Sequence, residues 1–180
     1  MNSRSVRPTK AEESAPLPGD EIVPEANVVM DRAFTLDVPS EVVWPWFAQL
    51  GKRRAGWYLP AVIERIIPPK RRGLRHIDAE LQQLAVGDII PDWGGKDATF
   101  EVAVAYAPYA FVYTSTRGRV TLSWAVTLTA RTDRATRVHL RLRLGNVKRE
   151  RLARIGGGFV DWLTIYGLAA GLRERVIEAN

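Results

Sequence analysis

The chain of 180 residues has no cysteine, and it has only two histidines, His76 and His139. The missing thiols exclude disulfides, thiolate nucleophiles, cysteine-based zinc sites and iron–sulfur clusters, and they fit a protein of the reducing cytoplasm. The two histidines are far apart in the sequence, and neither has a second ligand at metal-binding spacing. We therefore predict a cytoplasmic protein with no metal and no cofactor.

The chain also lacks a long uninterrupted hydrophobic run. Its most apolar stretch, Phe159–Leu172, is interrupted by Asp161 and followed by the charged residues 173–175, so we predict that it is too short and too charged to span a bilayer. Residues 1–27 are rich in Pro, Ser, Glu and Ala. We predict a disordered or loosely draped tail there, without a secretory signal or membrane anchor, and a single domain over residues 28–180.

Positive charge exceeds negative charge, with a formal net charge of +6. Residues 1–27 carry three bases against five acids, so the excess lies in the remainder of the chain. It is concentrated in a basic loop over 70–76 with the preceding Arg65, and in residues 131–154. These stretches are interpreted as solvated arginine-rich faces, with contact to an anionic membrane as an alternative. Nucleic-acid binding is not expected, because aromatic residues are not interleaved with the arginines.

Hydrophobic periodicity predicts an α+β order of elements. A β-branched stretch over 28–38 predicts a strand, followed by two short helices over 41–50, with Ser40 as N-cap, and 58–67. After Gly87 a period of two predicts antiparallel hairpins, and helical spacing returns over 159–177. The glycines 156–158 are interpreted as a turn that caps this last helix. The predicted fold is a curved antiparallel sheet wrapped around a long C-terminal helix.

The alternation within the predicted strands assigns side chains to a dry and a wet face. His139 shares the parity of Arg137 and Arg141, so it is predicted to be a solvated surface histidine. Arg32 instead shares the parity of apolar neighbours and should point toward the dry side. A buried arginine needs a partner. Either it forms a structural ion pair with Asp92 or Asp161, or it meets a ligand carboxylate or enolate.

Three pieces of the sequence carry a family resemblance: EVVWPW at 41–46, GWY at 56–58 and LAVGD at 84–88. Together with the surrounding residues 28–178 they resemble the START-like, helix-grip superfamily, also called SRPBCC, and within it the polyketide cyclase/dehydrase and lipid-transport-like group. Many relatives carry an aromatic-acid-aromatic sequence after GWY and a His-Pro before the Glu-Leu-Gln, where this chain has LPAV and Asp-Ala. The resemblance implies a helix-grip fold and a hydrophobic-ligand pocket more than it implies a reaction.

A single helix cannot fill the concave side of a wide bent sheet, so we expect space between the sheet, the long helix and the two short helices. Large rings with a polar tip suit the wall of such a pocket, although core filling explains any one of them equally well. The candidate ligand-binding residues are Trp44, Trp57, Tyr58, Phe100, Tyr113, Trp124, Trp162 and Tyr166.

The predicted function is binding of a hydrophobic small molecule such as a lipid, polyketide or aromatic metabolite. The alternative is a cyclase or dehydratase without metal or covalent nucleophile, in which Arg32 stabilises an enolate and Tyr113 or Asp92 moves a proton. A third, less favoured hypothesis is a basic surface module that binds an anionic membrane or nucleic acid. The sequence offers no activated acid–base pair, which favours the first hypothesis.

Overall fold

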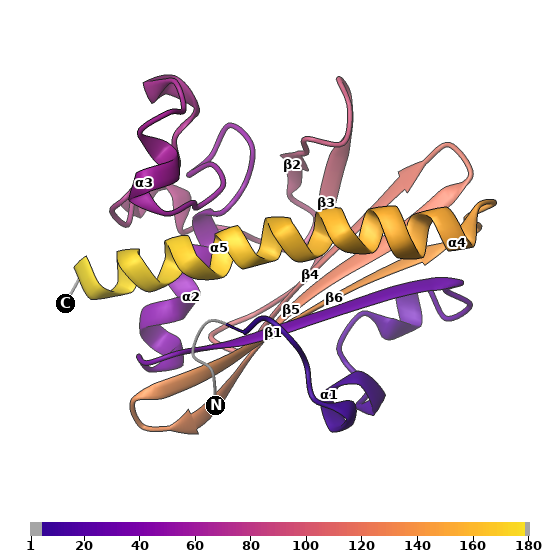
Figure 1. Cartoon of the computed structure of the whole chain (residues 1–180), viewed down its shortest axis with the longest axis horizontal. Helices are drawn as coiled ribbons and strands as arrows, with labels where there is room; N and C mark the ends of the chain where they lie inside the picture. Colours follow the sequence, from indigo (N-terminus) through magenta and orange to yellow (C-terminus); the bar gives the residue numbers. More distant parts are fainter. Residues whose placement is uncertain (1–4, 179–180) are drawn as a thin grey trace.

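The computed structural model of the chain describes residues 5–178 and contains one six-stranded sheet (Figure 1). All neighbouring strands are antiparallel, in the spatial order β1-β6-β5-β4-β3-β2. Sequence alternation predicted these hairpins, and the prediction is confirmed. The strands are β1 Val28–Leu36, β2 Ile89–Pro91, β3 Thr99–Tyr106, β4 Ala110–Arg117, β5 Val120–Thr132 and β6 Ala135–Gly145.

A long helix crosses one face of this sheet, as Figure 1 shows. It consists of α4 (Glu150–Leu152), a π-helical segment (Ala153–Gly157) and α5 (Gly158–Glu178) in direct succession. The predicted α+β helix-grip class is therefore confirmed. The predicted glycine turn before the last helix is wrong, because the helix already begins at Glu150 and the glycines lie inside it. By length and composition alone, the whole helix Glu150–Glu178 could cross a membrane, whereas the sequence predicted that its apolar stretch was too short and too charged. A third of its most apolar 18-residue stretch is buried inside the protein.

Two further helices follow β1: α2 (Ser40–Gln49), where Pro39 rather than Ser40 is the N-cap, and α3 (Ala61–Glu64). The second helix is much shorter than the predicted 58–67, and its apolar face is not turned inward. Val62 and Ile66 are exposed, whereas Glu64 is buried. The reason is electrostatic, because Glu64 faces the core to meet a buried arginine.

That arginine is Arg175 of α5, whose side chain has no exposed surface. Its guanidinium lies 2.5 Å from the Glu64 carboxylate. It also donates to four carbonyls, those of Leu59, Gly73, Leu74 and Gly171. A buried charge is tolerated only with such complete pairing. The contacts fix the C-terminal half of α5 to the 59–75 segment.

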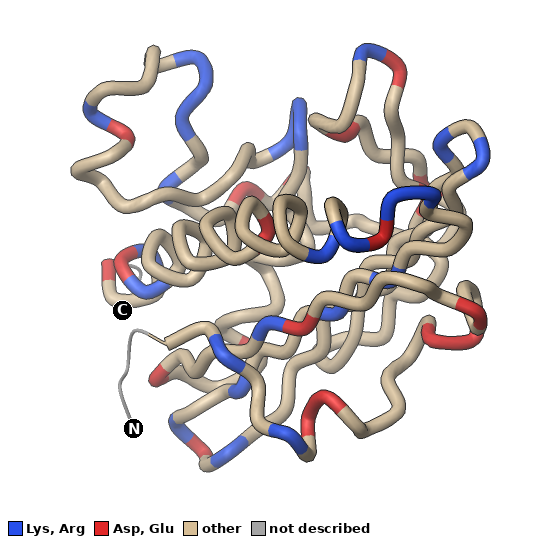
Figure 2. The backbone as a smooth tube through the Cα atoms, turned by 45° about the vertical axis from the view of Figure 1, so that its right-hand side comes forward, with Lys and Arg blue, Asp and Glu red and all other residues tan. Residues whose placement is uncertain are grey.

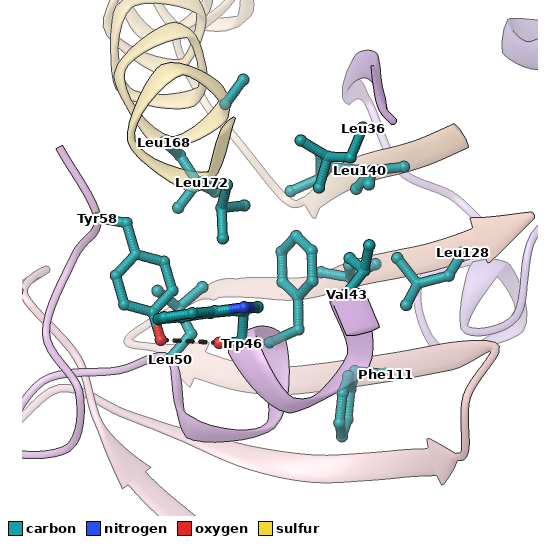
Figure 3. Packing of buried hydrophobic residues seen from close by; sticks show 14 of the residues in the cluster. Leu36, Val43, Trp46, Leu50, Tyr58, Phe111, Leu128, Leu140, Leu168 and Leu172 are labelled. Carbon is teal, nitrogen blue, oxygen red and sulfur yellow. Dashed lines mark hydrogen bonds between the residues drawn. The ribbon is translucent and has the colours of Figure 1, made fainter. Parts of the chain in front are cut away.

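The core lies between α2, the inner face of the sheet and the C-terminal half of α5 (Figure 3). Tyr58 is fully buried there, and its hydroxyl donates a 2.9 Å hydrogen bond to the Trp46 carbonyl. The chain around Leu59 passes directly beneath the helix. This close approach requires Gly171, since a Cβ at that position would lie 2.7 Å from the Leu59 backbone.

Residues 1–27 were predicted to be a disordered or loosely draped tail. Residues 1–4 lie outside the described residues, and residues 5–27 differ from the prediction because they are packed against the sheet. They pack on the outer face of β1 and β6, opposite α5 (Figure 1). A short helix, α1 (Lys10–Ser14), begins with a capping box between Thr9 and Glu12. Val6 is buried, and its carbonyl accepts a 3.1 Å hydrogen bond from the Ala33 amide at the edge of β1.

The acids of this N-terminal segment neutralise the arginines of β6. Arg137 donates to Glu12 at 2.7 Å, and Arg141 donates to Asp20 at 2.9 Å. His139 is buried and lies 2.7 Å from Asp31, so the prediction of a solvated surface histidine is wrong. The parity was right, but the N-terminal segment covers the face that parity alone assigns to water. Arg137, Arg141 and Arg143 of β6 are therefore covered by the N-terminal segment and do not form an open basic surface for nucleic acid or membrane.

The first prediction concerns the helix crossing. Gly171→Ala should lower the free energy of unfolding by about 2–3 kcal/mol, because the added methyl meets backbone atoms that cannot move aside. Gly158→Ala is the matched control in the same helix, since nothing lies within 4 Å of its Cβ position. The control should be unchanged or up to about 1 kcal/mol more stable. Urea denaturation of both variants measures the difference, and equal effects would contradict the close crossing.

The second prediction concerns pH. Arg137, mainly through its hydrogen bond, lowers the pKa of Glu12 from 4.5 to about 2. A lowered folded-state pKa gives stability that is present above the unfolded pKa and lost as the pH falls through the folded value. Glu12→Gln keeps the capping box and should cost about 1 kcal/mol at pH 7.

This cost should shrink as the pH falls from 4.5 towards 2, the interval that the Glu12 pKa shift spans. Glu13→Gln is the control, because Arg141 contacts only the Glu13 carbonyl. Denaturation curves measured across that pH range test both variants. A Glu12→Gln cost that does not depend on pH would show that the ion pair does not stabilise the fold.

Candidate functional site

A cavity of about 730 Å³ lies between the sheet and the N-terminal half of the long helix. Most of its lining is apolar. The sheet and the neighbouring loops contribute Met30, Leu50, Trp57, Ile90, Pro91, Asp92, Trp93, Phe100, Tyr113, Trp124, Leu142 and Leu144. The helix contributes Ala153, Gly156, Gly157, Val160, Asp161, Thr164 and Ile165.

Strand register builds the floor of this cavity. Met30 lies opposite Leu142, Leu142 opposite Trp124, and Trp124 opposite Tyr113, which makes a row across β1, β6, β5 and β4. Residues directly opposite each other in adjacent strands point to the same face. All four residues of the row line the cavity.

The helix side of the cavity is not filled by side chains, because the helix changes composition along its length. Where it crosses the filled core it presents Leu168 and Leu172, both fully buried. Over the cavity it presents small residues, Ala153, Gly156 and Gly157. Large side chains on the sheet therefore face small ones on the helix, and the space between them is not filled.

Five aromatic side chains form a continuous wall. The ring of Trp124 lies 5.5 Å from that of Tyr113, 6.2 Å from Phe100 and 6.3 Å from Trp57. Trp57 in turn meets Trp93 edge to face at 5.8 Å. Offset and edge-on contacts of this kind hold rings in fixed orientations. The wall is therefore a preformed apolar surface.

The main charged pair at the cavity is Arg32 with Asp161, whose atoms Nε and Oδ2 are 2.9 Å apart. Arg32 also donates to the Gly158 carbonyl at 2.8 Å. Of the two partners that the sequence suggested, Asp161 is the one found. Burial raises the pKa of Asp161, and the nearby Arg32 cation opposes that increase. The pair joins β1 to the start of α5.

The other two candidates for chemistry lie in different surroundings. Asp92 forms an ion pair with Arg117, and Lys52 donates to the Asp92 carbonyl at 2.7 Å. Tyr113 is buried, which raises the pKa of its hydroxyl. Within residues 5–178 no hydrogen bond links Arg32, Asp92 and Tyr113 to one another.

Four of the eight candidate ligand-binding residues line the cavity: Trp57, Phe100, Tyr113 and Trp124. The other four do not. Trp44 stacks on Phe111 with ring centroids 3.8 Å apart, and Tyr58 belongs to the core. Trp162 and Tyr166 lie on the outer side of α5 and are partly exposed.

Sequence reasoning missed the helix side of the cavity and Trp93. The signal was present in the small residues Ala153, Gly156 and Gly157, which were interpreted as part of a turn instead of as a thin helix face. Trp93 follows the short strand β2 and was assigned only to a loop. Across residues 5–178 no group of three or more His, Cys, Asp or Glu side chains gathers that could hold a metal ion.

Comparisons by sequence found no matching protein-family model and no matching curated protein. Among solved structures, a protein from Rhodobacter sphaeroides is similar, with 10% identity and a TM-score of 0.53, covering 87% of this chain and 97% of its own. CalU16 from Micromonospora echinospora matches at 15% identity and a TM-score of 0.46, covering 83% of this chain and 81% of its own. These similarities concern the fold alone.

A third prediction follows from the Arg32–Asp161 pair. Arg32→Gln should lower the free energy of unfolding by about 2 kcal/mol at pH 7, because Asp161 then carries a buried charge without a partner. Because the folded-state pKa of Asp161 is raised above the unfolded value, its charge costs stability at any pH above the unfolded pKa. The loss should therefore shrink as the pH falls towards about 4 and be largely absent below it. The double variant Arg32→Gln/Asp161→Asn should recover most of the stability at pH 7. Denaturation curves at pH 7 and at about pH 4 measure these differences in stability. A double variant that is no more stable at pH 7 than Arg32→Gln would refute the pairing.

Proposed function

We propose that this protein binds a hydrophobic small molecule, such as a lipid, polyketide or aromatic metabolite, in the cavity between the sheet and the long helix, and carries it in the cytoplasm. The observation that carries the proposal is the apolar cavity of about 730 Å³ with its continuous aromatic wall. The helix-grip fold and the resemblance to the START-like (SRPBCC) superfamily support the same conclusion.

The size and lining of the cavity suit a small molecule. Pockets for such ligands usually measure about 300–1,000 Å³ and combine apolar walls with few polar groups. Burial of about 300 Å² of apolar ligand surface contributes roughly 7 kcal/mol, from which the cost of association is subtracted. We therefore expect micromolar or weaker affinities.

The polar groups that could orient a ligand are few. Tyr113 keeps its proton at neutral pH because burial raises its pKa, so its hydroxyl can donate a hydrogen bond to a ligand oxygen. Asp161 is held by Arg32 at the helix side of the cavity. A largely apolar molecule with one or two oxygen atoms fits these groups.

The charged residues near the cavity support binding without a reaction. Arg32 and Asp92, the charged residues considered for a cyclase or dehydratase, are each engaged in an ion pair. An enolate would have to compete with Asp161 for the Arg32 cation. Among residues 5–178 no contact favours that reaction over simple binding.

The fourth prediction tests occupancy of the cavity with the neutral fluorescent probe N-phenyl-1-naphthylamine. The wild-type protein should bind it saturably, with energy transfer from tryptophan. Thr164→Trp places a large ring in the cavity and should weaken binding by about 10-fold or more. Tyr166→Trp is the control, because residue 166 lies on the outer side of the same helix.

Equal affinities of wild type and Thr164→Trp, with both proteins folded by circular dichroism, would contradict binding in this cavity. Equal losses in both variants would locate the probe on the outside of the helix. Only a loss confined to Thr164→Trp supports the proposal.

A further inference from the structure

The outer side of the long helix carries a row of large apolar side chains, which we call the outer stripe. Its exposed fractions are high for such residues: 63% for Leu152, 77% for Ile155, 61% for Phe159 and 54% for Leu163. Trp162 and Tyr166 complete it at 39% and 37%. The spacing of three or four residues places all six on one side of the helix.

The fold itself does not need this stripe. The opposite side of α5 already supplies the core contacts through Ile165, Leu168 and Leu172. An ordinary surface helix is polar on the side turned to water, whereas a helix that is apolar on both sides is covered on both. The outer stripe is therefore a surface that something else covers.

Its aromatic members are arranged as a ladder. The ring of Trp162 lies 6.0 Å from Phe159 and 5.6 Å from Tyr166. Tryptophan and tyrosine combine an apolar ring with a polar tip, and they favour the boundary between hydrocarbon and water.

Positive charge gathers at the start of the same helix. Lys148, Arg149 and Arg151 are exposed, and Arg154 donates to the Asn27 carbonyl. The single acid among them, Glu150, accepts a hydrogen bond from Asn27. Figure 2 shows this basic group at one end of the helix. A partner that covers the stripe therefore meets both an apolar surface and several cations.

We propose that the outer stripe docks on the surface of an anionic lipid bilayer, with the helix lying in the plane of the membrane. A helix of this kind inserts its apolar side to the depth of the headgroups, while its lysines and arginines contact anionic lipids. A spanning orientation does not fit, because the inner side of α5 belongs to the core and Asp161 is bound to Arg32.

The position of the stripe relates it to the cavity. Val160 and Thr164 line the cavity from the flank of the same helix. Docking would bring this flank next to the lipid headgroups. The proposal nevertheless stands independently of the cavity ligand, because membrane binding requires only the outer stripe and its cations.

The test is co-sedimentation of the full chain with vesicles of phosphatidylcholine containing about 30% phosphatidylglycerol, and with vesicles of phosphatidylcholine alone. Wild type should bind the anionic vesicles and bind the neutral ones far more weakly. Phe159→Ser/Leu163→Ser should weaken binding about 100-fold, because two inserted side chains are lost. Lys148→Gln/Arg149→Gln/Arg151→Gln should also weaken it about 100-fold, at about fivefold per charge.

The control is Tyr106→Ser/Tyr109→Ser, which removes two exposed aromatic side chains at the β3–β4 turn. This variant should bind as wild type does. If it loses binding as strongly as the stripe variant, the assignment to the stripe is wrong. Absence of vesicle binding by wild type also overturns the proposal. In that case, loss of self-association of Phe159→Ser/Leu163→Ser in sedimentation equilibrium would show that a second copy covers the outer stripe instead.

Discussion

The structure depends on how one buried cation fixes the long helix. Arg175 satisfies its charge with Glu64 and with four backbone carbonyls, and so anchors the C-terminal half of α5 against the 59–75 segment. The glycine at 171 allows that segment to pass at contact distance. With one half of the helix fixed in this way, the other half is held above the sheet, and its side chains determine how much of the space beneath is filled.

Composition then divides the helix into two functional parts. Leucines close the gap over the core, and small residues leave it open over the row from Met30 to Tyr113. The π-helical segment and its glycines belong to the open part. Stability is thus provided mainly by one half of the sheet–helix interface, and the cavity occupies the other half. The apolar outer stripe lies on the same half as the cavity.

The fold class could be predicted from the sequence because period-two alternation and the helical C-terminus are local signals. The cavity could be predicted only in part. Trp124 follows from strand parity, whereas Tyr113, Trp44 and Tyr58 were assigned by residue type. Of these three only Tyr113 lines the cavity, and the other two lie in other packing contacts. His139 shows the limit of parity, since the covering segment comes from the other end of the chain. Such long-range contacts leave no periodic trace in the sequence.

The N-terminal segment has a consequence for where this domain begins. A boundary at residue 28, where the regular elements start, would separate the sheet from its own counter-ions and from the Val6 carbonyl that pairs with β1. Arg137, Arg141 and Arg143 would then lose their partners in this segment, and the outer edge of β1 would lose its pairing with Val6. An uncovered strand edge of this kind favours pairing with other chains. The N-terminal segment therefore shields the β6 cations and the β1 edge from other chains, and the smallest folding unit includes the residues from at least Val6 onward.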